Sequence, residues 1–236
     1  LLDDMASAWS GARTEACLRT RVRGEWSEEV HERALWCLDE QRRTVGSTLG
    51  AVAESRERAV LLQFVPALSE LGGVDDCLDE DALRVRTLPP PSERPTVEGL
   101  REELAELDAL LLTAQFEAAV ESARAIDARP DASSWAPAHA ELSLRLGRAL
   151  SGRGDLDAAE ARLVDGYLEA VDSQRVDIAS SIALELATLT GGLRNEPARG
   201  MLWIRLAEVH ERVRGQAPLR RAAQLHRRSS LLKELE

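Results

Sequence analysis

The side chains that could support acid–base, nucleophilic or metal chemistry are scattered along this chain. The histidines occur singly, with no HExxH-like pair to hold zinc, at His31, His139, His210 and His226. Neighbouring carboxylates such as Asp75 and Asp76 are typical of helix starts and charged surfaces. No Gly-x-Ser-x-Gly sequence is present, and no cysteine lies beside a histidine in the sequence. We therefore expect no catalytic residue, no metal site and no cofactor, and we do not expect an enzyme.

The cysteines Cys17, Cys37 and Cys77 have spacings that fit neither a zinc ribbon nor a CxxC redox motif. Two interpretations remain open. All three could be buried apolar thiols, or one disulfide could form and leave an odd thiol. Among the pairs within the chain we favour Cys37–Cys77, because an antiparallel second and third helix would return residue 77 toward the level of residue 37.

The elements that must position these side chains are predicted to be helices. Apolar residues make up 44% of the 236 residues, aromatic residues only 3%, and runs with period two are absent. The net charge of −11 argues against nucleic-acid binding. No apolar run approaches the roughly 18–20 residues that span a bilayer, so we expect no membrane insertion by this chain.

Residues 1–88 are predicted to form an antiparallel three-helix subdomain that holds the cysteines. Its first helix covers residues 1–21, its second follows an N-cap at Ser27, and its third covers Leu61–Leu71. Trp26 falls in the turn between the first two helices, where it could be an exposed contact residue. The proline-rich residues 89–95 cannot continue a helix and predict a connector.

The chain repeats itself over residues 96–236. Gln115–Ala119 and Asp155–Ala159 are the same turn-plus-helix entry, and Leu186–Gly200 is a weaker copy, with Asn195 as the expected N-cap. Residues 217–235 would begin a fourth unit that the chain does not complete. The period predicts about three stacked helix pairs.

Residues 140–173 resemble a tetratricopeptide repeat (TPR), a helix pair of about 34 residues. The match is carried by Leu146, Gly147, Leu150, Gly154, Leu156, Ala159, Leu163 and Gly166. Gly147 and Ala159 are the small residues that let the two helices approach closely. The first repeat departs from the pattern with Leu107 in place of glycine, and the third with Arg199 in place of alanine. The resemblance implies an all-α fold in which a right-handed helical solenoid covers residues 96–236.

The N-terminal part resembles the region upstream of such repeats in bacterial serine/threonine protein kinases. The similar residues are Trp9, Glu15–Cys17, Thr20–Glu25, Ser27, Cys37–Asp39 and Cys77. The resemblance implies the non-catalytic C-terminal sensor or scaffold region of a larger kinase, and the chain has no glycine-rich phosphate loop and no HRD-like or DFG-like triplet. The family layout implies the extracytoplasmic side of a bacterial inner membrane, where a disulfide is permitted; a cytoplasmic location is the alternative.

A stacked array of helix pairs binds a protein or peptide on the concave face lined by the first helix of each pair. The repeat's ligand-facing positions are Arg101, Leu104, Asp108, Glu141, Leu144, Arg148 and Ser151. We favour Arg148, because arginine can hold a carboxylate through two hydrogen bonds. The alternative is a solvated face without a ligand. An adaptor unrelated to kinases is the alternative function, and the open C-terminal repeat could also support a homo-oligomer.

Overall fold

The computed structural model describes residues 2–54 and 74–214, and these residues form helices and short connections without a strand. The prediction of an all-α fold is confirmed for them. The chain divides into two compact units, Leu1–Leu88 and Pro89–Glu236, which are described separately. The predicted helix at Leu61–Leu71 and the predicted helix at residues 217–235 lie outside the described residues.

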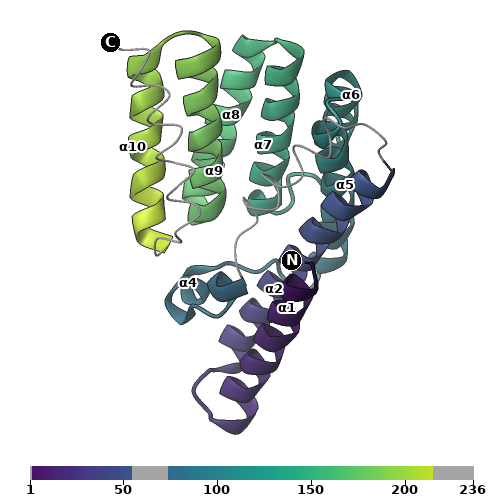
Figure 1. Ribbon diagram of the computed structural model, residues 1–236, viewed down its shortest axis with the longest axis vertical. Helices are drawn as coiled ribbons and strands as arrows, with labels where there is room; N and C mark the ends of the chain where they lie inside the picture. The colour runs from purple at the N-terminus through teal and green to yellow at the C-terminus, as the bar shows by residue number, and fades with distance from the viewer. Residues whose placement is uncertain (1, 55–73, 215–236) are drawn as a thin grey trace. The chain divides into compact units, whose positions relative to one another are not determined.

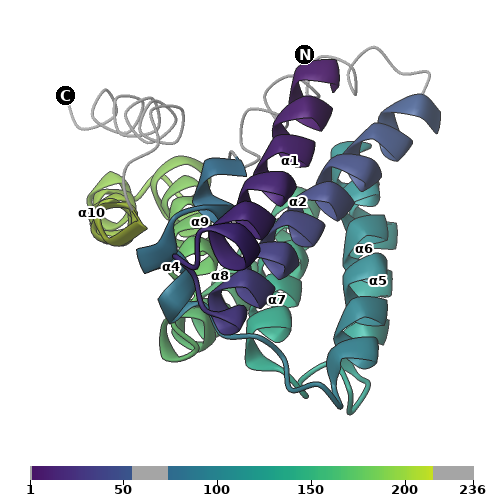
Figure 2. The same ribbon diagram turned by 90° about the horizontal axis from the view of Figure 1, so that it is seen from below.

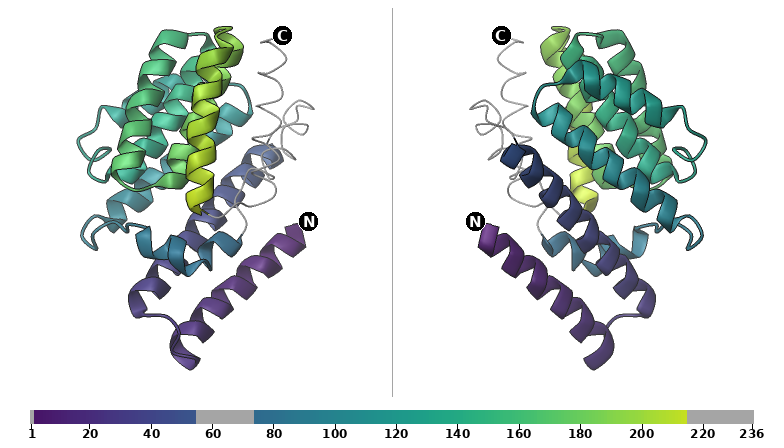
Figure 3. Two further views of the ribbon diagram at one scale, coloured as in Figure 1. Left: turned by 90° about the vertical axis from the view of Figure 1, so that its left-hand side faces the viewer. Right: turned by 90° about the vertical axis from the view of Figure 1, so that its right-hand side faces the viewer.

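The first unit is built on a helical hairpin. Helix α1 (Leu2–Cys17) continues into a π-helical turn, η1 (Leu18–Val22), and the chain reverses before α2 (Glu28–Glu54). The two helices run back along each other from this turn (Figure 3). Ser27 Oγ accepts a hydrogen bond from the amide of Val30 at 3.3 Å, which is the expected N-cap. A 3₁₀ turn, η2 (Val74–Cys77), and the short helix α4 (Glu80–Val85) complete the described part.

Small residues allow α1 and α2 to approach each other closely. Ala12, Ala16 and Ala34 are buried in one core with Leu38 and Leu83. The indole nitrogen of Trp9 donates to the carbonyl of Leu38 at 2.8 Å and ties the two helices together.

Trp26 is buried in the same core, so the interpretation of this residue as an exposed contact was wrong. Its ring lies under the guanidinium of Arg19, 4.9 Å from the ring centroid. A turn places the backbone at the surface, but the large apolar ring still gains from leaving water.

A disulfide joins Cys37 of α2 to Cys77 at the end of η2, the pair favoured from the sequence, with a Cα–Cα distance of 5.5 Å. Both residues are buried in the core of the first unit, while Cys17 is a free, exposed thiol. The bond attaches the segment from Val74 onward to the middle of α2.

The second unit is a series of antiparallel helices: α5 (Arg94–Leu112), α6 (Phe116–Asp127), α7 (Ala136–Arg153), α8 (Leu156–Asp172), α9 (Val176–Ala187) and α10 (Pro197–Arg214). A π-helical turn, η3 (Thr188–Leu193), extends α9. Each helix packs against the next one in the chain, and α7 also contacts both α5 and α9 (Figure 1). Figure 2 shows α5 and α6 side by side from another direction.

Glycines permit the closest helix contacts in this unit. A Cβ at Gly147 of α7 would lie 2.4 Å from Leu163 Cγ of α8, and a Cβ at Gly166 would lie 2.4 Å from Ser143 Cβ. Both distances are far below van der Waals contact. The expected close approach of α7 and α8 at Gly147 is therefore present, and Ala159 is fully buried beside it.

The same tight turn recurs between the helices. A residue in the left-handed region lies two positions before each of α6, α8, α9 and α10: Ala114, Gly154, Gln174 and Asn195. Asn195 is therefore the left-handed residue of its turn, and the prediction that it is the N-cap of α10 was wrong. Asparagine tolerates this conformation better than most side chains.

One helical stretch, Val176–Leu193 in α9 and η3, is long and apolar enough to span a membrane by length and composition. The prediction that no apolar run approaches this length was wrong for this stretch. Ile178, Ile182 and Leu186 are buried against neighbouring helices, and a core helix of a packed array has the same composition.

Candidate functional site

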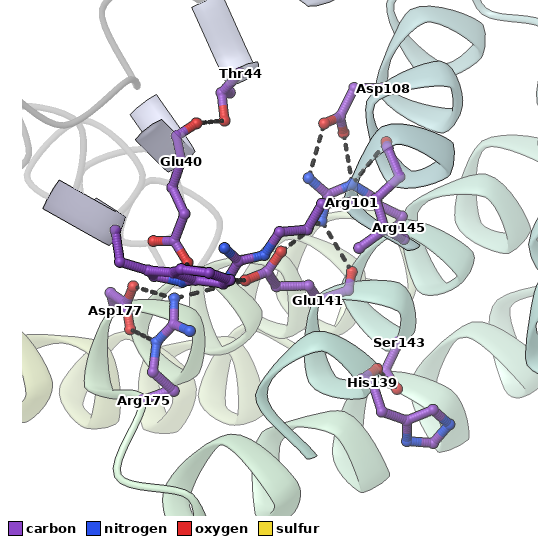
Figure 4. Close-up of polar contacts among 12 residues, drawn as sticks. Glu40, Thr44, Arg101, Asp108, His139, Glu141, Ser143, Arg145, Arg175 and Asp177 are labelled. Atoms are coloured by element: carbon purple, nitrogen blue, oxygen red, sulfur yellow. Dashed lines mark hydrogen bonds and ion pairs between the residues drawn. The ribbon is translucent and has the colours of Figure 1, made fainter. Parts of the chain in front are cut away.

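The charged side chains predicted to face a ligand belong to a network of ion pairs across α5, α7 and α9. Figure 4 shows Arg101 and Asp108 from α5, and Glu141 and Arg145 from α7, together with Arg175 at the start of α9. The network has three parts, one between α5 and α7, one at its centre and one between α7 and α9.

Arg145 joins α7 to α5. Its Nε and Nη2 donate to the two carboxylate oxygens of Asp108 at 2.9 and 2.8 Å. Nε also lies 3.2 Å from the carbonyl of Leu104, and Nη1 donates to the carbonyl of Glu141 at 3.1 Å. This arginine therefore satisfies most of its donors within the protein, and the two-point geometry fixes the register of α7 on α5.

Glu141 lies at the centre of the network, among three arginines. Its carboxylate is 3.9 Å from Arg101, 3.5 Å from Arg175 and 3.9 Å from Arg145. Arg175 in turn holds Asp177 through two hydrogen bonds of 2.9 Å. Arg101 and Arg175 are buried, and a buried guanidinium requires such compensation.

Arg148 joins α7 to α9. Its Nε donates to Glu185 Oε2 at 3.1 Å, and its side chain is 32% exposed, more than those of the other arginines in the network. A ligand on this face could therefore reach Arg148 more directly than the other arginines of the network.

The two predicted apolar contact residues lie in the core. Leu104 is 1% exposed and Leu144 is 8% exposed, so neither presents a surface to a ligand. Ser151 is half-buried near the end of α7. The structure thus brings together the charged members of the predicted set, leaves Ser151 outside the network and places the leucines between helices.

Sequence reasoning missed Arg145, Arg175, Asp177 and Glu185 as members of the network. The signal that could have found some of them is a spacing: Asp108–Arg145 and Arg148–Glu185 are both separated by 37 residues. Opposite charges separated by one helix pair are neighbours when successive pairs stack. With these residues included, the four arginines of the network face four carboxylates, so this face is electrically balanced although the chain is acidic.

A second polar cluster lies around His139 near the start of α7. Its Nδ1 is 2.7 Å from Glu169 Oε2 and its Nε2 is 3.0 Å from Asp127 Oδ1, while Arg162 donates to the same Asp127 oxygen at 2.6 Å. The hydrogen bond to Glu169 raises the pKa of His139 above its ordinary value, against the opposing effect of burial. Each ring nitrogen faces a carboxylate, so the cluster stabilises a protonated imidazolium. In the described part of the chain, no group of His, Cys, Asp and Glu could hold a metal ion.

Comparison with family models, with curated proteins and with solved structures found no match to this chain.

Proposed function

We propose that this chain is a non-catalytic protein–protein interaction region that binds a peptide or protein through the face formed by α5, α7 and α9. In this proposal the described residues 96–214 form a right-handed TPR-like solenoid. The region acts as the sensor or scaffold part of a larger bacterial serine/threonine kinase, as the sequence resemblance implies.

The observation that carries the proposal is the repeated ion-pair spacing across the first helices of the pairs. Asp108 and Arg145, and Arg148 and Glu185, are each 37 residues apart and connect equivalent neighbouring helices. Such regular stacking is typical of a solenoid.

The contacts between helices also favour curvature toward α5, α7 and α9. These helices contact one another in turn. The link from α8 to α10 includes large side chains, such as the edge-to-face pair of Tyr167 and Trp203 with centroids 5.3 Å apart. If α5, α7 and α9 lie closer to one another than α6, α8 and α10 do, the array curves toward α5, α7 and α9. The face that these three helices form is then the concave one.

The disulfide between Cys37 and Cys77 supports an extracytoplasmic location. Disulfides form and persist in oxidising compartments and are rare in the cytosol. The sequence upstream of this chain tests the kinase assignment directly, because a kinase domain followed by a membrane helix is expected there. An adaptor unrelated to kinases would have neither.

Panning a displayed random-peptide library on the chain tests the binding face. We expect enriched peptides to lose at least about tenfold in affinity on Arg148→Glu, because the variant reverses the most accessible charge of the network. The double variant Arg148→Glu/Glu185→Arg restores an internal ion pair but transposes the charges, so it should also fail to bind. Arg124→Glu on the exposed surface of α6 is the matched control.

Recovery of binding in the double variant would mean that the pair only holds the helices together. The proposed binding face would be refuted if no peptide were enriched, or if the enriched peptides bound all variants equally.

A further inference from the structure

Helix α10 carries an apolar stripe on its outer surface. Leu202, Leu206, Val209 and Val213 are separated by four, three and four positions, which places them on one side of a helix. Leu202 is 57% exposed, Val209 44% and Val213 68%, and Leu206 is half-buried. Isolated exposed apolar residues are ordinary, but a stripe at this spacing is the pattern with which one helix packs on another.

The equivalent positions of α8 are less apolar than the stripe of α10. Gly200, Ile204 and Ala207 of α10 share their spacing and their burial with Ala159, Leu163 and Gly166 of α8. In this register Leu206 corresponds to Asp165 of α8, and Val213 corresponds to Asp172. Both aspartates are exposed. At these two positions α8 carries carboxylates where α10 carries leucine and valine, while Leu202 corresponds to Ala161 and Val209 to Leu168, which is 55% exposed.

Two exposed arginines lie along one edge of the stripe, before and after Glu208 in the sequence of α10. Arg205 and Arg212 are exposed, and neither forms an ion pair within the described residues. By contrast, Arg194 and Arg199 nearby are both paired with Glu160. Arginines that form no ion pair, beside an exposed apolar stripe, are locally complementary to the carboxylates of an acidic partner.

We propose that the outer face of α10 (Leu202, Leu206, Val209 and Val213, with Arg205 and Arg212 beside it) docks an acidic amphipathic helix of a partner protein. The partner's apolar side chains pack on the stripe at a shallow crossing angle, and its carboxylates pair with the two arginines. This surface is separate from the face formed by α5, α7 and α9, so it does not depend on the peptide-binding proposal.

The charges disfavour two other occupants of this surface, which are a second copy of the chain and its own residues 215–236. If a second copy of this chain packed its own stripe here, Arg205 and Arg212 of one copy would lie close to the same arginines of the other. Residues 215–236 contain Arg220, Arg221, Arg227 and Arg228, which are of the same sign as Arg205 and Arg212. Like charges placed opposite each other oppose association, so an acidic helix is the occupant that the charges select.

Fluorescence anisotropy with two designed helical peptides tests the proposal. Both peptides have leucine at heptad positions a and d, and they carry either glutamate or lysine at e and g. We expect saturable binding of the glutamate peptide, and at least about tenfold weaker binding of the lysine peptide. Leu202→Ser/Val209→Ser should weaken the glutamate peptide by at least about tenfold, whereas Val22→Ser, which removes an exposed valine in the first unit, should leave its affinity unchanged.

Arg205→Glu/Arg212→Glu is the decisive variant, because it should reverse the preference from the glutamate peptide to the lysine peptide. All substituted side chains are exposed, and circular dichroism melts verify that the variants fold. Three results with the full chain would overturn the proposal. They are no binding of the glutamate peptide, equal binding of both peptides, and a dimer in analytical ultracentrifugation that the serine variants dissociate. Binding that appears only after deletion of residues 215–236 would also overturn it, because the chain itself would then be the occupant.

Discussion

Arg148 of α7 donates to Glu185 of α9 at 3.1 Å, and the two residues are 37 positions apart, as are Asp108 and Arg145. The helix α7 thus carries two arginines that point to opposite neighbours. Arg145 engages a carboxylate of the preceding first helix, and Arg148 engages one of the following first helix. This alternation lets one helix fix its register against both neighbours with the same side-chain chemistry.

The Arg145–Asp108 pair is expected to stabilise the second unit strongly. Arg145→Ala leaves the partly buried carboxylate of Asp108 without its counter-charge, and we expect a loss of about 3 kcal/mol in the free energy of unfolding. Chemical denaturation of Arg145→Ala, Asp108→Ala and the double variant gives the coupling energy, which should be about 1.5–3 kcal/mol. As a control, Glu117→Ala at the exposed pair with Arg153 should change stability by less than about 0.5 kcal/mol. A coupling near zero would show that the pair does not fix the helix register.

Gly147→Ala should destabilise the contact between α7 and α8. The added Cβ would lie 2.4 Å from Leu163 Cγ and 2.5 Å from its Cδ2, so the side chain or the helices must shift. We expect a cost of about 1–3 kcal/mol in thermal or urea unfolding. Gly99→Ala in α5 is the matched control, because its added Cβ meets no atom within 4 Å. That variant should be neutral or up to about 1 kcal/mol more stable, since alanine favours helix more than glycine does.

Reduction of the Cys37–Cys77 bond should destabilise the first unit. The bond closes a sequence separation of 40 residues, and the chain-entropy relation gives about 4 kcal/mol for a loop of this length. Hydrogen exchange in α2 with and without reductant measures the effect. The variant Cys37→Ser/Cys77→Ser should exchange at the reduced rate and not respond to reductant. Thiol titration of the denatured, unreduced protein should find one thiol, Cys17; three thiols would show that the bond is absent.

The sequence predicts the structure best at positions where the local geometry admits only a few residue types. Gly154 has a φ of +94° and is the turn residue expected between the two best-matched helices. Gly147 and Ala159 are small because two helices approach each other there. Gly154 could be interpreted from local backbone chemistry, and Gly147 and Ala159 from the resemblance to a helix-pair repeat.

The remaining turns and contacts depend on tertiary structure. Ala114, Gln174 and Asn195 adopt positive φ values although they are not glycine, so composition does not mark them. The repeat pattern predicts a ligand-facing position for Leu104, but the side chain is buried. The rotation of a helix by part of a turn decides which of these two environments a side chain has. The ion pairs of the network require the spatial order of α5, α7 and α9, which no single helix encodes.

The stability of the second unit should depend on pH through two histidines with opposite signs. The carboxylate of Glu169 raises the pKa of His139, so the folded state binds the proton more tightly than the unfolded state does. This stabilisation is complete below the ordinary histidine pKa of about 6.5 and is lost as the pH rises through the higher folded-state pKa. Burial lowers the pKa of His210, whose Nε2 lies 3.0 Å from the hydroxyl of Tyr167, so this residue destabilises the folded state as the pH falls.

Urea unfolding of His139→Gln and His210→Gln at pH 5.5 and pH 8.5 separates the two effects, because these values bracket the ordinary histidine pKa of about 6.5. The loss of stability caused by His139→Gln, relative to the wild type, should be larger at the acidic pH, where Glu169 and Asp127 hold an imidazolium. For His210→Gln the loss should be larger at the alkaline pH, because the wild type carries its neutral imidazole there at no protonation cost. Equal losses at both pH values for His139→Gln would mean that Arg162 alone compensates the two carboxylates.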